Sequence, residues 1–207
     1  MSTSNLIRWS GLSAMVGGLL LIVVDIAEFL LYGDQPESVT ATTNAWLILS
    51  ILALVGVVLI LLGLLGFYAS QAERAGTLGL VAFLVAFIGT AMLFGFAWAG
   101  TFVVPDLAQA VPEFLNTSGA GMLMLGVMFT FVLFVLGWLL FALASLQTRV
   151  LPRGAAVLLM VGAMLSLILS FLELPFFIVV FGAAQAWFGY ALWSGSGELA
   201  LNANAET

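Results

Sequence analysis

Long apolar runs alternate with short polar segments along the whole chain. Each run is close to the roughly 20 residues that an α-helix needs to cross a bilayer. We therefore predict an all-α fold, a polytopic membrane protein with six transmembrane helices in one bundle, forming a single domain over residues 1–194. The predicted spans are residues 12–32, 45–68, 77–104, 120–145, 154–174 and 176–193.

The polar segments between these runs predict turns and a tail. Residues 33–44 form an acidic loop, and residues 69–76 form a tight loop. Residues 105–119 carry apolar positions at helical spacing, which indicates a short helix in the membrane interface that Pro112 disfavours. Residues 195–207 are small, polar and acidic, so we expect a disordered cytoplasmic tail.

The basic residues predict the orientation of the bundle. All of them are arginines: Arg8 precedes the first run, Arg74 joins the second to the third, and Arg149 and Arg153 join the fourth to the fifth. Six spans place all four on one side, which the positive-inside rule makes cytoplasmic. We therefore expect both termini to face the cytoplasm.

The composition supports a membrane protein and excludes several chemistries. The 207 residues are 64% hydrophobic and 7% charged, with a mean hydropathy of +1.26, whereas soluble domains are about 25% charged. The chain contains no cysteine, histidine or lysine, which removes disulfides, the usual metal and haem ligands, and Schiff-base chemistry. We predict no metal and no cofactor. The net charge of −6 also argues against nucleic-acid binding.

A family resemblance agrees with this picture. The opening sequence IRWSGLSAMVGGLLLIV and the layout of six spans with small inner loops resemble bacterial membrane proteins of the DUF4386 type. The resemblance implies a multi-span bundle in a prokaryotic cytoplasmic (inner) membrane, and it carries over no catalytic residues.

Carboxylates inside the predicted spans are the main candidates for function. Asp25 and Glu28 are spaced i, i+3 on one face of the first helix, roughly 6 Å and about 10 Å beyond the membrane midplane on the outer side. Glu173 ends the fifth span at the same side. Because every arginine is predicted at the other side, these carboxylates need a proton, water, a bound cation or a partner protein.

Three further residues complete the candidate ligand- or ion-binding site. Ser170 lies one turn before Glu173, Gln185 lies near mid-depth in the sixth span, and Trp98 lies at the outer end of the third. Aromatic rings beside carboxylates suit an organic cation through cation–π attraction.

Each candidate also has a purely structural interpretation. Glu28 and Glu173 can reach the interface and be solvated, and Asp25 can be a protonated side chain bonded within the bundle. Ser170 continues a stripe of small residues with Gly162 and Ser166, which is typical of close helix packing. Gln185 suits an interhelical hydrogen bond, and Trp98 suits the aromatic belt.

Two functions from different classes follow. We expect a non-enzymatic protein that binds or passes a cation, a proton-coupled solute or a small amphiphile in a pocket open to the outer leaflet. The alternative is a non-catalytic accessory subunit whose carboxylates meet other membrane subunits. An intramembrane enzyme ranks third, since without His, Cys and Lys it would depend on carboxylates, hydroxyls and arginine. Membrane lipid is a partner in every case.

Overall fold

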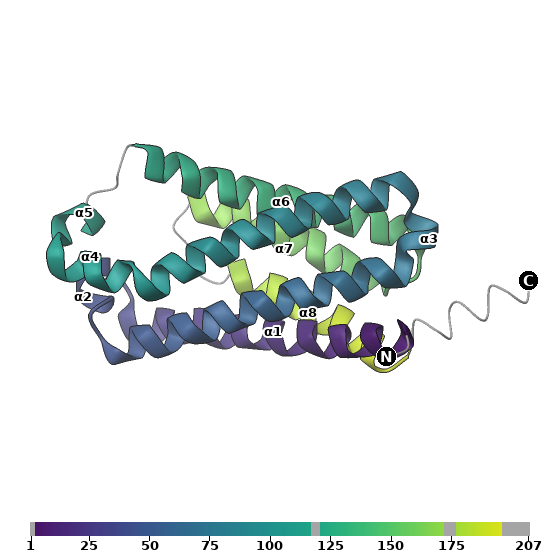
Figure 1. The fold of residues 1–207 in the computed structure, drawn as a ribbon, viewed down its shortest axis with the longest axis horizontal. Coiled ribbons are helices and arrows are strands. Elements are labelled where there is room, and N and C mark those ends of the chain that lie inside the picture. Colours follow the sequence, from purple (N-terminus) through teal and green to yellow (C-terminus); the bar gives the residue numbers. More distant parts are fainter. Residues whose placement is uncertain (1–2, 117–120, 172–176, 196–207) are drawn as a thin grey trace, which may run out of the picture.

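The computed structural model describes residues 3–116, 121–171 and 177–195, and all regular structure in these ranges is helical. The all-α class is thus confirmed, whereas predictions that concern Glu173 or the tail from residue 196 onward lie outside the described residues. The helices are α1 (Thr3–Tyr32), α2 (Glu37–Thr40), α3 (Asn44–Phe102), α4 (Val104–Ala110), α5 (Pro112–Asn116), α6 (Met122–Thr148), α7 (Arg153–Phe171) and α8 (Phe177–Trp193) (Figure 1).

The longest helix, α3, folds back on itself at Gly76 (Figure 1). Gly76 has φ 53° and ψ −148°, a backbone conformation that is essentially restricted to glycine. We call residues 44–75 the first arm and residues 77–102 the second arm. Close to the bend the two arms are joined by the stacked rings of Tyr68 and Phe83, whose centroids are 4.5 Å apart.

The predicted loop over residues 69–76 is wrong, because helix continues as far as the bend. The segment ASQAERA is polar, but alanine, glutamine, glutamate and arginine are all good helix formers. The turn is therefore confined to the glycine, and a polar stretch between two apolar runs was not a reliable sign of a loop.

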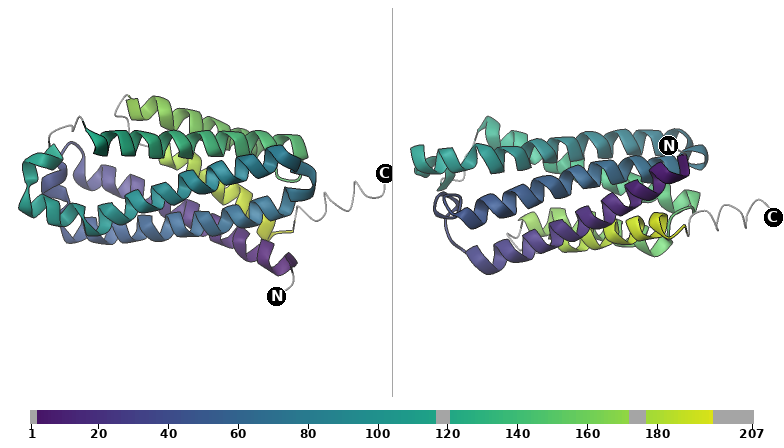
Figure 2. Two further views of the ribbon diagram at one scale, coloured as in Figure 1. Left: turned by 45° about the horizontal axis from the view of Figure 1, so that its top comes forward. Right: turned by 60° about the horizontal axis from the view of Figure 1, so that its bottom comes forward.

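The five long helices form a ring in which each one packs against two others. α1 contacts both α3 and α8, α3 contacts α6, α6 contacts α7, and α7 closes the ring against α8 (Figures 1 and 2). Within α3, the first arm faces α1 through Gly56 and Gly63, and the second arm faces α6 through Ala86 and Gly89.

Glycines bring α1 into direct backbone contact with α8. Gly11 lies against Gly189, where an added methyl group would meet the Gly189 carbonyl oxygen at 2.7 Å, and Gly18 lies against Gly182 in the same way. The pairs run in opposite order along the two helices, so α1 and α8 are antiparallel. We call this contact the glycine seam.

Small residues also serve the contact of α1 with α3 and that of α7 with α8. Gly17 and Ala14 of α1 approach Gly56 and Gly63 of α3. The predicted stripe on α7 is represented by Gly162, which lies on the Phe181 backbone; the side chains of Ser166 and Ser170 lie outside the described part of the helix.

Aromatic side chains fill the centre of the ring. Trp138 is fully buried, contacts the rings of Phe141 and Phe181, and donates its indole N–H to the Thr90 hydroxyl at 3.1 Å. Phe67 and Phe188, from α3 and α8, meet with centroids 5.3 Å apart.

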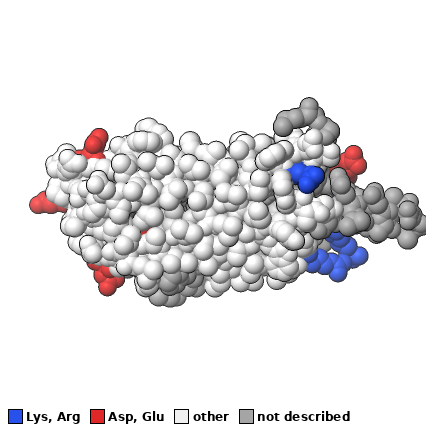
Figure 3. Space-filling model, turned by 90° about the horizontal axis from the view of Figure 1, so that it is seen from below, with Lys and Arg blue, Asp and Glu red and all other residues white. Residues whose placement is uncertain are grey.

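The surface of the ring is apolar and its charges lie at the two ends. Three helices, α1 from Ser4 onward, α3 and α6, are long and apolar enough to cross a membrane, and α7 and α8 contribute shorter apolar stretches among the described residues. On the face shown in Figure 3, basic side chains gather at one end and most acidic side chains at the other. This arrangement suggests a membrane-embedded helical protein.

At the acidic end, α2, α4 and α5 pack on one another to form a cap (Figure 1). The predicted short helix after the third run is present but divided: α4 ends at Ala110 and α5 begins at Pro112, because proline is favoured at a helix start and disfavoured inside. The acidic loop before Asn44 likewise contains a helical turn, α2.

Candidate functional site

Asp25 lies on the face of α1 that runs along α8. Gly11 and Gly18 mark this face, because they meet Gly189 and Gly182 in the glycine seam. Asp25 follows Gly18 by the same step of seven residues, which is about two helical turns. The α8 helix is described from Phe177, five residues before Gly182, so Asp25 lies near this end of α8.

Asp25 and Glu28 form a pair of carboxyl groups, as their spacing predicted. Both side chains are partly buried, and the two carboxyl groups lie close enough to repel each other. One carboxyl oxygen of Asp25 is shielded from solvent, and its neighbours Leu21 and Val24 are buried in the bundle. The structure therefore brings two acidic groups together at the edge of an apolar core.

No arginine lies near this pair, since all four are at the opposite end of the bundle, at the start of α1, near the bend of α3 and between α6 and α7. The cap adds carboxylates to the same end as the pair. Although much of Glu37 is exposed, partial burial of its carboxyl group raises its pKa above the ordinary value. The electrostatic potential of this end therefore favours cations. The acidic residues of the cap and the turn before it are Asp34, Glu37, Asp106 and Glu113.

Gln185 is fully buried in the centre of the ring, with its Cβ beside Gly18. Neither its amide nitrogen nor its amide oxygen has a hydrogen-bond partner among the residues that the structure describes. The predicted interhelical hydrogen bond of Gln185 is therefore not found. Because Gly18 and Asp25 are about 10 Å apart along α1, Gln185 is not adjacent to the carboxylates.

The other candidates are only partly placed. Trp98 is half exposed and contacts Phe102, another exposed aromatic residue, at a centroid distance of 5.7 Å. This position fits the aromatic-belt interpretation. Ser170 belongs to α7, but its side chain is outside the description, as is all of Glu173.

The sequence did not predict a buried polar network at the arginine end. The Gln71 side chain donates to the Ser145 hydroxyl at 3.1 Å and accepts from the Thr148 hydroxyl at 2.9 Å. These bonds fasten the first arm of α3 to the end of α6. Gln71 gave no signal, because it stands in the polar stretch that was predicted to be a loop.

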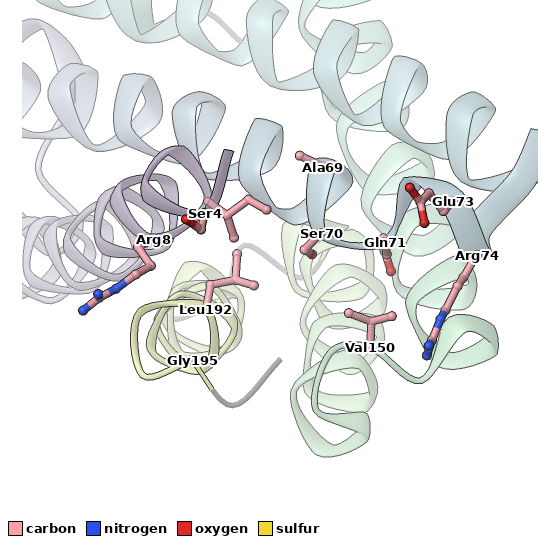
Figure 4. A pocket seen from close by; sticks show the side chains of 11 residues that line it. Ser4, Arg8, Ala69, Ser70, Gln71, Glu73, Arg74, Val150, Leu192 and Gly195 are labelled. Carbon is pink, nitrogen blue, oxygen red and sulfur yellow. The ribbon is translucent and has the colours of Figure 1, made fainter. Parts of the chain in front are cut away.

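Next to this network lies a pocket of about 300 Å³ (Figure 4). Its lining comes from the start of α1, the first arm of α3, the turn between α6 and α7, and the end of α8. The pocket is thus at the opposite end of the bundle from the predicted outer-leaflet site. No group of three acidic residues suited to a metal ion occurs within the described ranges.

No family model, curated protein or solved structure matches this chain. The arrangement of its own residues is therefore the basis for inferring a function.

Proposed function

We propose that the chain is an integral membrane protein that binds or passes a cation, a proton-coupled solute or a small cationic amphiphile at a site around Asp25 and Glu28. The observation that supports this proposal is the pair itself: two partly buried carboxyl groups, close enough to repel each other, with every arginine at the far end. A bound cation or proton relieves this repulsion. Without either, two negative charges would stay close together in apolar surroundings, which is unfavourable.

The proposed topology has six spans with both termini in the cytoplasm. The bend at Gly76 supports it, since it makes two antiparallel arms out of α3. The arms, together with α1, α6, α7 and α8, supply six antiparallel segments. The gathering of all the arginines at one end is what the positive-inside rule expects of this arrangement. The carboxylate pair then belongs to the outer leaflet of a cytoplasmic membrane.

Substitution at Asp25 tests the proposal. Asparagine keeps the shape and hydrogen-bonding groups of aspartate but cannot ionise, so Asp25→Asn should fold normally and lose any response to pH or cations. The measurement is the Tm of the detergent-purified protein from pH 5 to pH 8, with sodium, potassium or tetraethylammonium chloride added. Wild type should change its Tm with pH or with at least one cation.

The matched control is Asp34→Asn, which removes an exposed carboxylate from the turn just after α1. This variant should keep the wild-type response. A response that persists in Asp25→Asn, or a wild type that ignores pH and all three cations, contradicts the proposal.

A second candidate, an accessory subunit of a membrane complex, is favoured by the start of α6. Large apolar side chains there are highly exposed, with Met122 at 85% and Leu123 at 63%. A partner subunit would cover this surface, although lipid also suits it. Purification in a mild detergent separates the two functions: a subunit should retain other chains in fixed proportion, and a cation-binding protein should be stable alone.

A further inference from the structure

The pocket at the arginine end, which we call the basal pocket, lies between two pairs of elements. α1 and α8 form one side, and the first arm of α3 with the turn between α6 and α7 forms the other (Figure 4). The Gln71 amide is part of its wall, but both ends of this amide are already bonded to Ser145 and Thr148. Gln71 therefore shapes the pocket and leaves ligand binding to its neighbours.

Two arginines flank the basal pocket. Arg8 comes from α1 and Arg74 from α3, and both side chains are exposed. They lie on opposite sides of the pocket, and Arg8 points away from the other lining side chains (Figure 4). Neither forms an ion pair with any residue in the described ranges. Arg8 stacks on the Trp193 ring, 5.1 Å from its centroid, and a guanidinium held by its face keeps its edge N–H groups available for an anion.

The remaining lining has the character of a site for an amphiphile. Ile7, Val150 and Leu192 supply apolar wall, and the last two are buried. Outside the pocket, the exposed side chains of Leu6 and Trp9 continue the apolar surface along α1. A ligand with a charged head and an apolar tail matches both parts.

The charge of the lining suits an anion, and the apolar wall suits an anion with a lipid tail. Glu73 also lines the basal pocket, so Arg8, Arg74 and Glu73 together carry one net positive charge. At neutral pH a phosphodiester carries one negative charge and inorganic phosphate carries between one and two, so the net charge of the lining attracts both. A phosphodiester on a lipid also brings the apolar chains that the walls suit.

We propose that the basal pocket binds the headgroup of an anionic phospholipid, with its phosphate at the rim that Arg8 and Arg74 mark and its glycerol and upper acyl chains against Ile7, Val150 and Leu192. Basic pockets between membrane helices on the cytoplasmic side are suited to anionic headgroups. The site is independent of the carboxylate pair at the other end. It would fasten α1 and α8 to the bend of α3 in a membrane that contains anionic lipid.

The test measures the Tm of the purified protein in detergent with added phosphatidylglycerol, with phosphatidylcholine, or with inorganic phosphate alone. Phosphatidylglycerol should raise the Tm of wild type, and the other two additions should leave it nearly unchanged. In the double variant Arg8→Gln/Arg74→Gln the shift should disappear. In Arg8→Lys/Arg74→Lys a reduced shift should remain, because the charge is kept and the bidentate geometry is lost.

The matched control is Arg153→Gln, an exposed arginine at the same end that does not line the basal pocket. It should keep the full shift. An equal shift in the glutamine double variant or an equal effect of phosphatidylcholine overturns the proposal. An equal effect of inorganic phosphate overturns the lipid assignment. If the glutamine double variant does not fold, the lysine double variant is compared with Arg153→Gln. An equal loss of the Tm shift caused by phosphatidylglycerol in these two variants contradicts a site formed by Arg8 and Arg74.

Discussion

Two buried glutamines of this protein differ in what surrounds them. Gln71 is 1% exposed and bonded at both ends of its amide, whereas Gln185 is 0% exposed and its amide has no partner among the described residues. An unsatisfied amide in an apolar core costs about 1–3 kcal/mol, so such a residue is retained only where something compensates for it. The two glutamines should therefore respond differently when an apolar side chain of similar size replaces them.

Replacing each glutamine by leucine distinguishes these environments. Gln185→Leu should raise the free energy of unfolding by about 1 kcal/mol or more, because it removes an unsatisfied polar group without changing the volume greatly. Gln71→Leu should lower it by about 1–3 kcal/mol, because Ser145 and Thr148 lose a buried partner. Denaturation in detergent micelles measures both. If Gln185→Leu is the more damaging change, its amide has a partner in the folded protein.

At the scale of single residues, the sequence predicted contacts that depend only on helix geometry. The proximity of Asp25 and Glu28 follows from their spacing within one helix. The sequence could not predict the Gln71 network, or a Gln185 amide without a partner among the described residues, because both depend on which helices meet and at what height. That information comes from contacts between residues far apart in the chain, such as those of Gly18 with Gly182 and of Gln71 with Ser145.

At the scale of elements, apolar runs located the helices well because the length of an apolar segment is a strong signal. The predicted ends of the helices were less accurate. α1 begins at Thr3, well before the predicted residue 12, since the polar start of the chain can also be helical. At about 45 Å, α1 is longer than the roughly 30 Å hydrocarbon core, so its first turns extend beyond it.

The glycine seam allows a controlled test of how α1 and α8 are held together. Gly18→Ala should lower the free energy of unfolding by about 1–3 kcal/mol, because its methyl group would collide with the Gly182 backbone. The matched control is Gly126→Ala in α6, where nothing lies within 4 Å of the added methyl group. That variant should be neutral or more stable by about 0.5–1 kcal/mol, since alanine favours helix.

Thermal and denaturant unfolding of both alanine variants in detergent provide the measurement. A Gly18→Ala protein as stable as Gly126→Ala would show that α1 and α8 do not meet through these glycines.

At the scale of the whole molecule, the two ends have opposite chemistry. The arginines, the Gln71 network and the basal pocket lie at one end, and the carboxylate pair and acidic cap lie at the other. A ring of antiparallel helices has this polarity only if all the segments that carry arginine lie at the same end. The bend at Gly76 is decisive, because it returns the second arm of α3 to the acidic end. From there α6 runs back and brings Arg149 and Arg153 to the end that holds Arg8 and Arg74.

Single cysteines test the orientation of this polarity in the membrane. The chain has no native cysteine, so each variant reports one position. Thr42 and Asn116 are exposed near and in the acidic cap, and Gln147 is exposed at the arginine end. Thr148 is unsuitable, since it is buried and bonded to Gln71 and would resist labelling on either side.

With a membrane-impermeant maleimide applied to intact cells, Thr42→Cys and Asn116→Cys should react and Gln147→Cys should not. Permeabilised cells supply the control, in which all three should react. Labelling of Gln147→Cys from outside would invert the orientation and place the carboxylate pair in the inner leaflet. Thr42 and Asn116 flank α3, so they lie on the same side of the membrane if each arm of α3 crosses it once. Opposite labelling of Thr42→Cys and Asn116→Cys would therefore mean that the two arms do not both cross the membrane.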